Sequence, residues 1–324
     1  MSKITGRLVS LGIAKETVRG AGASPAMWLP QTEFSVADKV EKVRDDSGFG
    51  NLADSQDIAV AEKYAEGDIA GQLRDQTFGY FLLALLGSVS SSASGAGYSH
   101  AFSLSQSNQH QSLSLVKKDA LSAQMFKLTM LKSLGIKVAL DSFVSFTAGI
   151  LAKNGAATTA TAAPSAENRF TKKHVSVKLG AAITDLAAAT ALDLKSLELN
   201  IEKNVIRDSG FGTVQPLDIL NKSLSVSGSF SLNYEDQTFH DYVMGGTKKA
   251  MRLTLNNTDV DLGSGLRPSL TIDLPSVDFD WTPNYALEEI VSQTINFKAN
   301  YDLTNAQQII HACTLVNAKA NYSA

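Results

Sequence analysis

Asp46-Ser-Gly-Phe-Gly50 occurs a second time in this chain as Asp208-Ser-Gly-Phe-Gly212, at an offset of 162 (208 − 46). Two further pairs of segments recur in the same order at an offset of 161: Val40–Lys42 with Ile201–Lys203, and Asp75–Phe78 with Asp236–Phe239. The offset is half of the 324-residue length. A period of this size is a whole domain and not a short solenoid repeat. We therefore interpret the chain as a tandem duplication of one domain.

Composition places the joint between the two copies. Residues 152–168 (AKNGAATTATAAPSAEN) are small, polar and low in complexity, which is typical of a flexible linker or a long exposed loop. We expect a first domain at residues 1–153, a linker at 154–169 and a second domain, the duplicate of the first, at 170–324. A similar stretch at Ser88–Ser99 predicts an exposed loop inside the first domain.

Apolar and polar residues alternate in both halves, which predicts strands with one buried face. In residues 224–234, for example, the apolar residues alternate with serines and Asn233, and Gly228 lies on the apolar face; these apolar residues are Leu224, Val226, Phe230, Leu232 and Tyr234. The same pattern predicts strands at 197–201, 251–255, 270–274, 295–301, 126–130, 134–138 and 144–150. The predicted fold class is mainly β, with a β-sandwich or barrel in each half.

One short helix interrupts the strands in each half. Asp75 is expected to cap a helix whose apolar residues follow helical spacing from Phe78 to Leu86 and which ends at Gly87. In the second half Asp236 is the expected cap, and Gly245 with Gly246 ends the helix. Each half is therefore predicted to be antiparallel sheet with one amphipathic helix packed on its flank.

Composition excludes several classes of protein. The formal net charge is -3, from 29 basic and 32 acidic residues, which argues against a nucleic-acid binder held by net positive charge. The single cysteine, Cys313, excludes an internal disulfide framework and indicates a reducing cytoplasm as the folding environment. The most apolar run, Phe78–Leu86, is far shorter than the roughly 20 residues of a membrane helix. No signal-peptide core and no membrane segment are expected.

The sequence contains no recognisable catalytic, cofactor-binding or metal-binding pattern, so none of these sites and no cofactor is expected. The histidines are scattered and are expected to be surface or hydrogen-bonded side chains: His100, His110, His174, His240 and His311. The acidic clusters lack a calcium-loop pattern and are expected to be solvated or to face a lumen: Asp45–Asp46, Glu62–Asp68, Asp259–Asp261 and Asp278–Asp280. Cys313 is expected to be a buried small apolar residue, and Trp28 and Trp281 to pack at domain margins.

The outer faces of the predicted strands carry mostly Ser, Thr, Asn and Ala, and the chain has only 7 prolines. Monomeric β proteins usually protect their strand edges with lysine or proline. These strands are compatible with pairing and favour edge-to-edge assembly.

The chain resembles the bacteriophage tail tube proteins of the long, duplicated type over nearly its whole length. The similar segments occur in this order: Lys15–Gly20, Trp28–Pro30, Asp75–Gly79, Ser107–Leu113, Asn200–Asn204, Lys249–Leu253, Asn257–Val260 and Gln293–Ala299. The loops after Gly87 and around Pro283–Tyr285 depart from the family pattern.

The resemblance implies two tail-tube domains per chain and a structural, non-enzymatic virion protein assembled in the host cytoplasm. Three chains would form a ring with pseudo-six-fold symmetry, and stacked rings would form the tail tube with one continuous inner barrel. The implied partners are further copies of the chain, a tape-measure protein, and tail-tip or terminator proteins. DNA would pass through the lumen during ejection without sequence-specific binding, and the near-balanced charge permits an acidic lumen that repels phosphate.

Two alternatives remain open from sequence. One is another virion or surface β protein, such as a capsid decoration or an adhesin. The other is an enzyme on a β scaffold, which would need a cleft with paired carboxylates.

Overall fold

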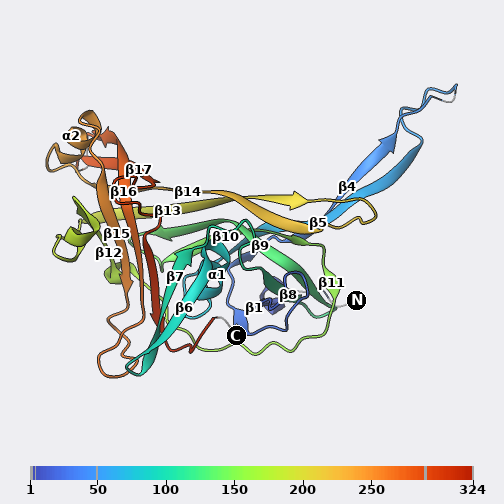
Figure 1. The fold of residues 1–324 in the computed structure, drawn as a ribbon, viewed down its shortest axis with the longest axis horizontal. Helices are drawn as coiled ribbons and strands as arrows, with labels where there is room; N and C mark the ends of the chain where they lie inside the picture. Colours follow the sequence, from blue (N-terminus) through green and yellow to red (C-terminus); the bar gives the residue numbers. More distant parts are fainter. Residues whose placement is uncertain (1–2, 4, 49, 288–289, 323–324) are drawn as a thin grey trace.

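A computed structural model describes residues 3, 5–48, 50–287 and 290–322, and it is mainly β, as predicted (Figure 1). Its largest feature is a sheet of eight antiparallel strands in the order β4–β5–β10–β9–β13–β14–β17–β16. These strands are β4 (Ala37–Asp45), β5 (Asp57–Gln72), β9 (Ala123–Val138), β10 (Ser145–Lys153), β13 (Leu194–Asp208), β14 (Asp218–Asn233), β16 (Ser269–Asn284) and β17 (Ser292–Asn300).

Strands β9 and β16 each take part in a second set of pairings near their first residues. There β9 pairs with β8, which pairs with β1 and through it with β2. Strand β16 pairs there with β15 and β18, β15 pairs with β12, and β18 pairs with the β6–β7 hairpin. The bounds are β1 (Ser10–Lys15), β2 (Met27–Leu29), β3 (Glu33–Phe34), β6 (Gly87–Ser94), β7 (Gly97–Leu104), β8 (Leu113–Lys118), β11 (Ala156–Ala157), β12 (Val175–Gly180), β15 (Lys249–Asn256) and β18 (Ala312–Asn317).

The predicted strands are all present. The segment 224–234 lies in β14 up to Asn233, and 251–255 pairs with 270–274 as the predicted hairpin of β15 and β16. The segments 126–130 and 134–138 belong to one strand, β9, which has an irregular register opposite β10. Alternation therefore located these strands, although parts of β10 and β16 are buried on both faces.

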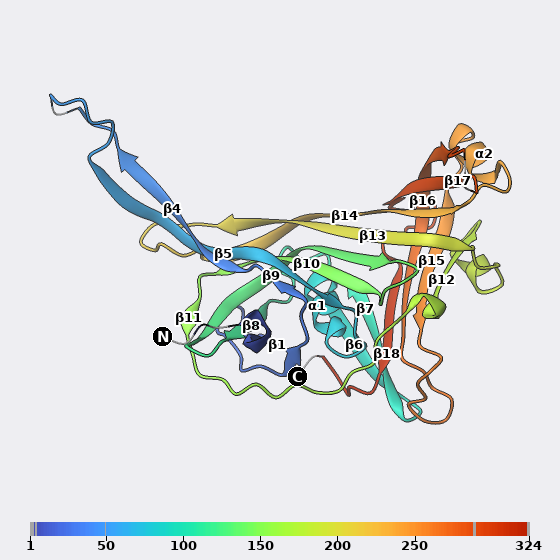
Figure 2. The same cartoon turned by 180° about the vertical axis from the view of Figure 1, so that it is seen from behind.

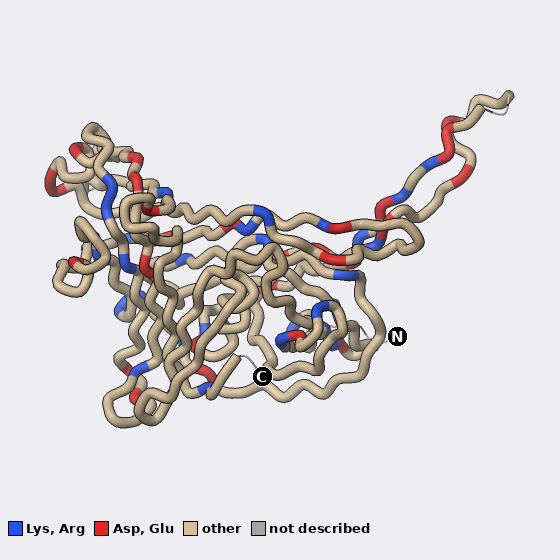
Figure 3. The backbone as a smooth tube through the Cα atoms, viewed as in Figure 1, with Lys and Arg blue, Asp and Glu red and all other residues tan. Residues whose placement is uncertain are grey.

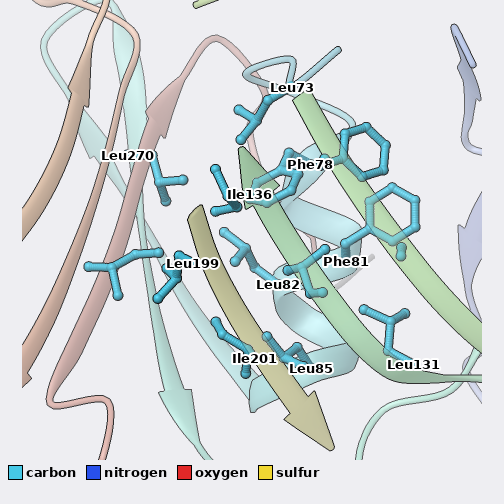
Figure 4. Packing of buried hydrophobic residues seen from close by; sticks show 14 of the residues in the cluster. Leu73, Phe78, Phe81, Leu82, Leu85, Leu131, Ile136, Leu199, Ile201 and Leu270 are labelled. Carbon is cyan, nitrogen blue, oxygen red and sulfur yellow. The ribbon is translucent and has the colours of Figure 1, made fainter. Parts of the chain in front are cut away.

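Helix α1 (Phe78–Leu86) contacts β9 of the eight-stranded sheet and also the β6–β7 hairpin, and it forms the centre of the core (Figure 4). It ends at Gly87 as predicted, in a left-handed conformation with φ of 94°. The expectation of an amphipathic helix on the flank is wrong for α1, because all nine of its residues are buried. Phe81 packs against Phe78 and Phe146, and Leu82 and Leu85 lie near Leu199 and Ile201 of β13.

The expected cap of α1 is also wrong. Asp75 is fully buried, and its carboxylate accepts hydrogen bonds from the backbone N–H (2.9 Å) and the side-chain amide (2.8 Å) of Asn168. The first N–H groups of the helix region, those of Gln76 and Thr77, donate instead to Oε2 of Glu167 at 3.2 and 2.6 Å. A carboxylate at this place satisfies unpaired donors and interacts well with the helix dipole.

We expect Glu167→Ala to destabilise the chain by ~1 kcal/mol, the usual cost of losing a helix N-terminal acceptor. Glu167→Gln keeps an acceptor oxygen and is expected to recover about half of that loss. Urea unfolding of the three proteins measures the difference. Equal stability of Glu167→Ala and the unmodified chain would contradict this capping role.

Helix α2 (Thr238–Met244) matches the prediction more closely. Asp236 accepts a hydrogen bond from the N–H of Thr238 at 2.9 Å, and Gly245 follows the last residue. Phe239 is buried, while Tyr242 and Val243 are partly buried against the core. This helix is amphipathic and covers β16 at the margin of the molecule.

The predicted exposed loop at Ser88–Ser99 is wrong, because these residues form most of the β6–β7 hairpin with its turn at Gly95. Val89 packs on the core, Ser91 hydrogen-bonds to Nδ1 of His100 (2.8 Å), and the outer edge of β7 is covered by β18. Small serines fit β6 because the buried side chains of this hairpin, such as Phe102, lie on β7.

The segment expected to be a flexible linker is held at both ends. Ala152 and Lys153 continue β10, and residues 156–157 pair with β9 as β11. At the other end Glu167 and Asn168 bind the start of α1. The residues between them are mostly exposed and carry no helix or strand.

Candidate assembly surface

Both α-helices pack on core-facing side chains of the eight-stranded sheet, α1 through Phe81 on Phe146 and α2 through Phe239 on Phe230 and Phe279. Among the described residues, no α-helix is found to pack on the opposite face, which we call the helix-free face (the strands are drawn in Figures 1 and 2). Because side chains alternate along each strand, the burial pattern assigns each residue to one of these faces. Ile136, Leu199 and Phe230 point into the core, for example, while Lys137, Asn200 and Ser229 point away from it. Over β13, β14 and β17 the helix-free face is formed by polar and small residues, as the sequence predicts for the second face of these strands. Nearer β4, Leu151 and Tyr64 on this face join a small apolar cluster with Ile219.

The helix-free face has an excess of negative charge over its central part. Its acidic residues there are Asp68, Glu198, Glu202, Asp278 and Asp280, and its basic residues are Lys137 and Lys298. Two of the predicted acidic clusters contribute to it, Asp278–Asp280 and part of Glu62–Asp68. A surface with this balance repels phosphate groups.

The two halves of the chain join across the middle of this sheet. Strand β9 pairs with β13 from Val138 opposite Leu197 to Ser133 opposite Glu202. On the core side this places Leu134 opposite Ile201, both at most 2% exposed. The halves therefore share one continuous sheet and one continuous core.

Each end of the eight-stranded sheet has an open edge. Strands β3 and β4 pair with β5 only, among the described residues. From Asp278 to Asn284, β16 likewise has β17 as its single partner within the described chain. Such edges present unpaired backbone N–H and C=O groups and are templates for another strand.

The β4–β5 hairpin forms an arm that projects from the body (Figures 1 and 2), with acidic and basic residues interspersed along it (Figure 3). Every residue of β4 is exposed, including Val40 and Val43, and Ile58 of β5 is 46% exposed. The β13–β14 hairpin behaves differently, because its end lies on β4 and β5. There Arg207 pairs with Glu41 (2.6 Å) and Glu62 (2.9 Å).

A buried lysine links the second half to α1. Lys203 of β13 is 2% exposed, and its ammonium group donates to the carbonyl oxygen of Ala84 at 2.7 Å, near the negative end of the helix dipole. Burial, with a smaller contribution from Arg19, lowers the pKa of Lys203 to about 7. The nearby His110 ring lies between the carbonyl oxygens of Leu85 and Ser105, each at 2.9 Å, and burial lowers its pKa.

The low pKa of Lys203 makes stability depend on pH. Between pH 7 and 10.5 the unfolded chain binds one more proton at this lysine than the folded chain, so stability rises with pH by up to ~1.4 kcal/mol per unit. Lys203→Met is expected to remove this slope. Urea unfolding at pH 7, 8, 9 and 10 compares the two proteins. A constant difference between them over this range would contradict a neutral buried lysine.

The histidine, cysteine, acidic and tryptophan residues considered as candidate site residues are dispersed over the structure. Within the described residues no group of three or more His, Cys, Asp or Glu could hold a metal ion. His100 and His174 are buried and hydrogen-bonded, and His240 stacks edge-on against Trp281. Cys313 is buried, which raises the pKa of its thiol to about 12. Trp28 is buried beside β1, and Trp281 donates to Gln293 at 2.8 Å.

Sequence reasoning missed Glu167 and Lys203. Glu167 lies in a segment whose composition indicated a linker, so no helical pattern marked it as a cap. Lys203 had a weak signal, since it continues the buried series Leu197, Leu199 and Ile201 at a spacing of two. The alternation rule therefore places this charge on the core face.

The structure defines the class of the chain as a β protein whose continuous sheet has an open edge at each end, and open edges are able to pair with further strands. The chain belongs to the phage tail tube protein family, whose family model matches residues 6–299. It is therefore a structural protein of the phage tail, as the sequence resemblance predicted. A comparison with curated proteins finds no match. No helix in the described part of the chain is long and apolar enough to span a membrane.

Proposed function

We propose that this chain is a duplicated tail tube protein, three copies of which form a ring with pseudo-six-fold symmetry. The rings stack into the tube through which DNA leaves the virion. The observation that carries this proposal is the single eight-stranded sheet with one open edge at each end. Edges of this kind allow head-to-tail pairing of copies, which closes into a ring when the rotation fits.

Support for the duplication comes from the strand order of the two halves. The first half pairs in the order β1–β8–β9–β10–β5–β4, and the second pairs as β12–β15–β16–β17–β14–β13. Both ends of β14 are related to the ends of β5 by the offset of the sequence repeat (218 − 57 = 161 and 233 − 72 = 161). The domain boundaries 1–153 and 170–324 are proposed on this basis, with 154–169 as the connection.

Three copies of an eight-stranded sheet supply 24 strands. With roughly 4.8 Å between strands and about 40° of tilt, a closed barrel of this size measures ~45–50 Å between opposite backbones. After side chains are placed, this leaves room for a nucleic-acid duplex. We place the helix-free face on the inside, where its acidic excess lets DNA pass without holding it. A tape-measure protein would occupy the same lumen during assembly, and tail-tip or terminator proteins would bind the tube ends.

Negative-stain electron microscopy of the purified chain tests this proposal. We expect rings or hollow tubes with a stain-filled central channel, also when tail-tip proteins are needed to initiate them. Solid particles or monomers alone under all conditions, with tail-tip proteins included, would contradict it and would favour a decoration or adhesin role.

A further inference from the structure

We infer that neighbouring chains join by pairing residues 280–285, the end of β16 and the residue after it, with the outer edge formed by residues 34–39 of the next copy, in one defined antiparallel register. This inference rests on the proposed ring and specifies the contact that closes it. The partner at each edge is a second copy of this chain. The template for the contact is the β9–β13 junction inside the chain.

The β16 side of the register follows from the neighbouring strands. In the first half, Ser145 of β10 lies opposite Gln72 of β5 and Lys137 of β9. In the second half, Ser292 of β17 lies opposite Asn233 of β14 and Asn284 of β16. Because the repeat offset relates Asn233 to Gln72 (233 − 72 = 161), Asn284 takes the place of Lys137. The edge residues 280–285 therefore correspond to residues 133–138 of β9.

The β4 side follows in the same way. Ala37 lies opposite Glu66 of β5, and Asn200 lies opposite Ser227 of β14, which the same offset relates to Glu66 (227 − 66 = 161). Residues 34–39 therefore correspond to residues 197–202 of β13. Within the chain, β9 residues 133–138 pair with β13 residues 197–202. The same pairing between copies places Phe34 opposite Tyr285, Val36 opposite Pro283, Ala37 opposite Thr282 and Lys39 opposite Asp280.

The chemistry of the two edges suits this register. Lys39 and Asp280 are both exposed, and directly opposite side chains lie on the same face of an antiparallel pair. On the core side, Tyr285 is 63% exposed in the single chain and would cover Phe34, and Val36 would meet Pro283. Two of the three core-side pairs are therefore apolar, as in the β9–β13 junction, and the third places Trp281 opposite Asp38, where the junction has Leu134 opposite Ile201.

On the β4 side, alternate backbone N–H groups face away from β5 and toward the next copy. The N–H of Ser35 donates to the carbonyl oxygen of Asp68 on β5 at 2.9 Å. Since donors alternate along a strand, the N–H groups of Val36 and Asp38 point outward to the next copy. Pro283 has no N–H, so the opposite edge lacks one donor at that position. The proposed junction therefore has one ladder hydrogen bond fewer than the β9–β13 junction, where Ile136 takes the corresponding place.

Engineered disulfides test the register in the assembled protein. Ala37 and Thr282 form a non-hydrogen-bonded pair in it, with about 4.5 Å expected between Cα atoms, which lies within disulfide range. The variant Ala37→Cys with Thr282→Cys, oxidised after assembly, is expected to give covalent dimers and trimers on a non-reducing gel. Cys313 is buried and does not compete.

Matched variants separate this register from others. Gly135→Cys with Asn200→Cys is the same pair inside the chain and should cross-link without forming dimers. Lys39→Cys with Thr282→Cys represents a shift of two residues and should form cross-links at least about tenfold more slowly, because these residues are diagonal neighbours about 7–8 Å apart in the stated register, beyond the usual disulfide range. Ala37→Cys alone should remain monomeric on the gel.

The outcomes distinguish this inference from the proposed function. Rings that cross-link through Ala37→Cys with Thr282→Cys support both. Rings that cross-link faster in the shifted pair, through Ala37→Cys alone, or through none of these variants overturn the register and leave the ring intact. Absence of rings in the unmodified chain, with tail-tip proteins included, overturns both. A charge exchange adds a second readout: Lys39→Asp should raise the concentration needed for assembly by up to about fivefold, and adding Asp280→Lys should restore it.

Discussion

Asp38→Pro is expected to raise the concentration required for assembly at least tenfold while leaving the single chain folded. Because the N–H of Ser35 points to β5 and donors alternate along the strand, the N–H of Asp38 is expected to point outward, and its loss should remove no hydrogen bond to β5. In the assembled ring the same change removes a ladder hydrogen bond worth about 0.5–1.5 kcal/mol and places the proline ring against the neighbouring strand. Sedimentation of the protein over a range of concentrations measures the effect.

The matched control for this change is Asp38→Ala. Both variants lose the hydrogen bond that the Asp38 carboxylate accepts from the N–H of Gly155 at 2.7 Å, but only the proline loses the backbone donor. Asp38→Ala should assemble nearly as the unmodified chain does. Assembly of Asp38→Pro at unchanged concentration would show that this edge is not used.

Phe81→Ala is expected to destabilise the chain by ~3–5 kcal/mol, the usual cost of removing a buried phenylalanine ring. Phe81 is 1% exposed and packs in the middle of α1 against Phe78 and Phe146. Because α1 lies at the centre of the shared core, the surrounding side chains can relax only partly into the cavity that the substitution leaves. Thermal and urea unfolding would measure the loss.

Tyr242→Ala on α2 provides the comparison. Tyr242 contacts Phe239 and Phe279 but is only partly buried. Its removal should cost clearly less than that of Phe81, about 1–2 kcal/mol. Equal losses of unfolding free energy in Phe81→Ala and Tyr242→Ala would contradict the central place of α1 and would indicate that both helices lie on the flank.

The two helices show how far the sequence could reach. Helical spacing located both of them, and the glycines after them marked their ends. The spacing marked only one stripe of α1, but its other positions are also apolar or small, and a helix that is apolar all round is expected to be buried. In α1 the remaining positions are Gly79, Tyr80, Leu83 and Ala84, all compatible with a core.

Long-range contacts explain the remaining errors. Asp75 was expected to bind the helix that follows it, yet its partner is Asn168, which is far away in the sequence. The serines of β6 were interpreted as a loop because the strand that orders them, β7, is held in turn by β18 from the far end of the chain. In each case a residue from a distant segment replaced the local interaction that sequence patterns describe. The helix-free face, in contrast, depends only on alternation and was anticipated from the uncharged Ser, Thr and Asn residues.

A cryo-electron microscopy reconstruction of the assembled tube tests the central claim most directly. The account predicts three chains per ring, each 34.5 kDa, with a continuous inner barrel of 24 strands and β16 of one chain beside β4 of the next. Six chains per ring, or an inner wall in which the sheet is interrupted between β16 of one chain and β4 of the next, would contradict it.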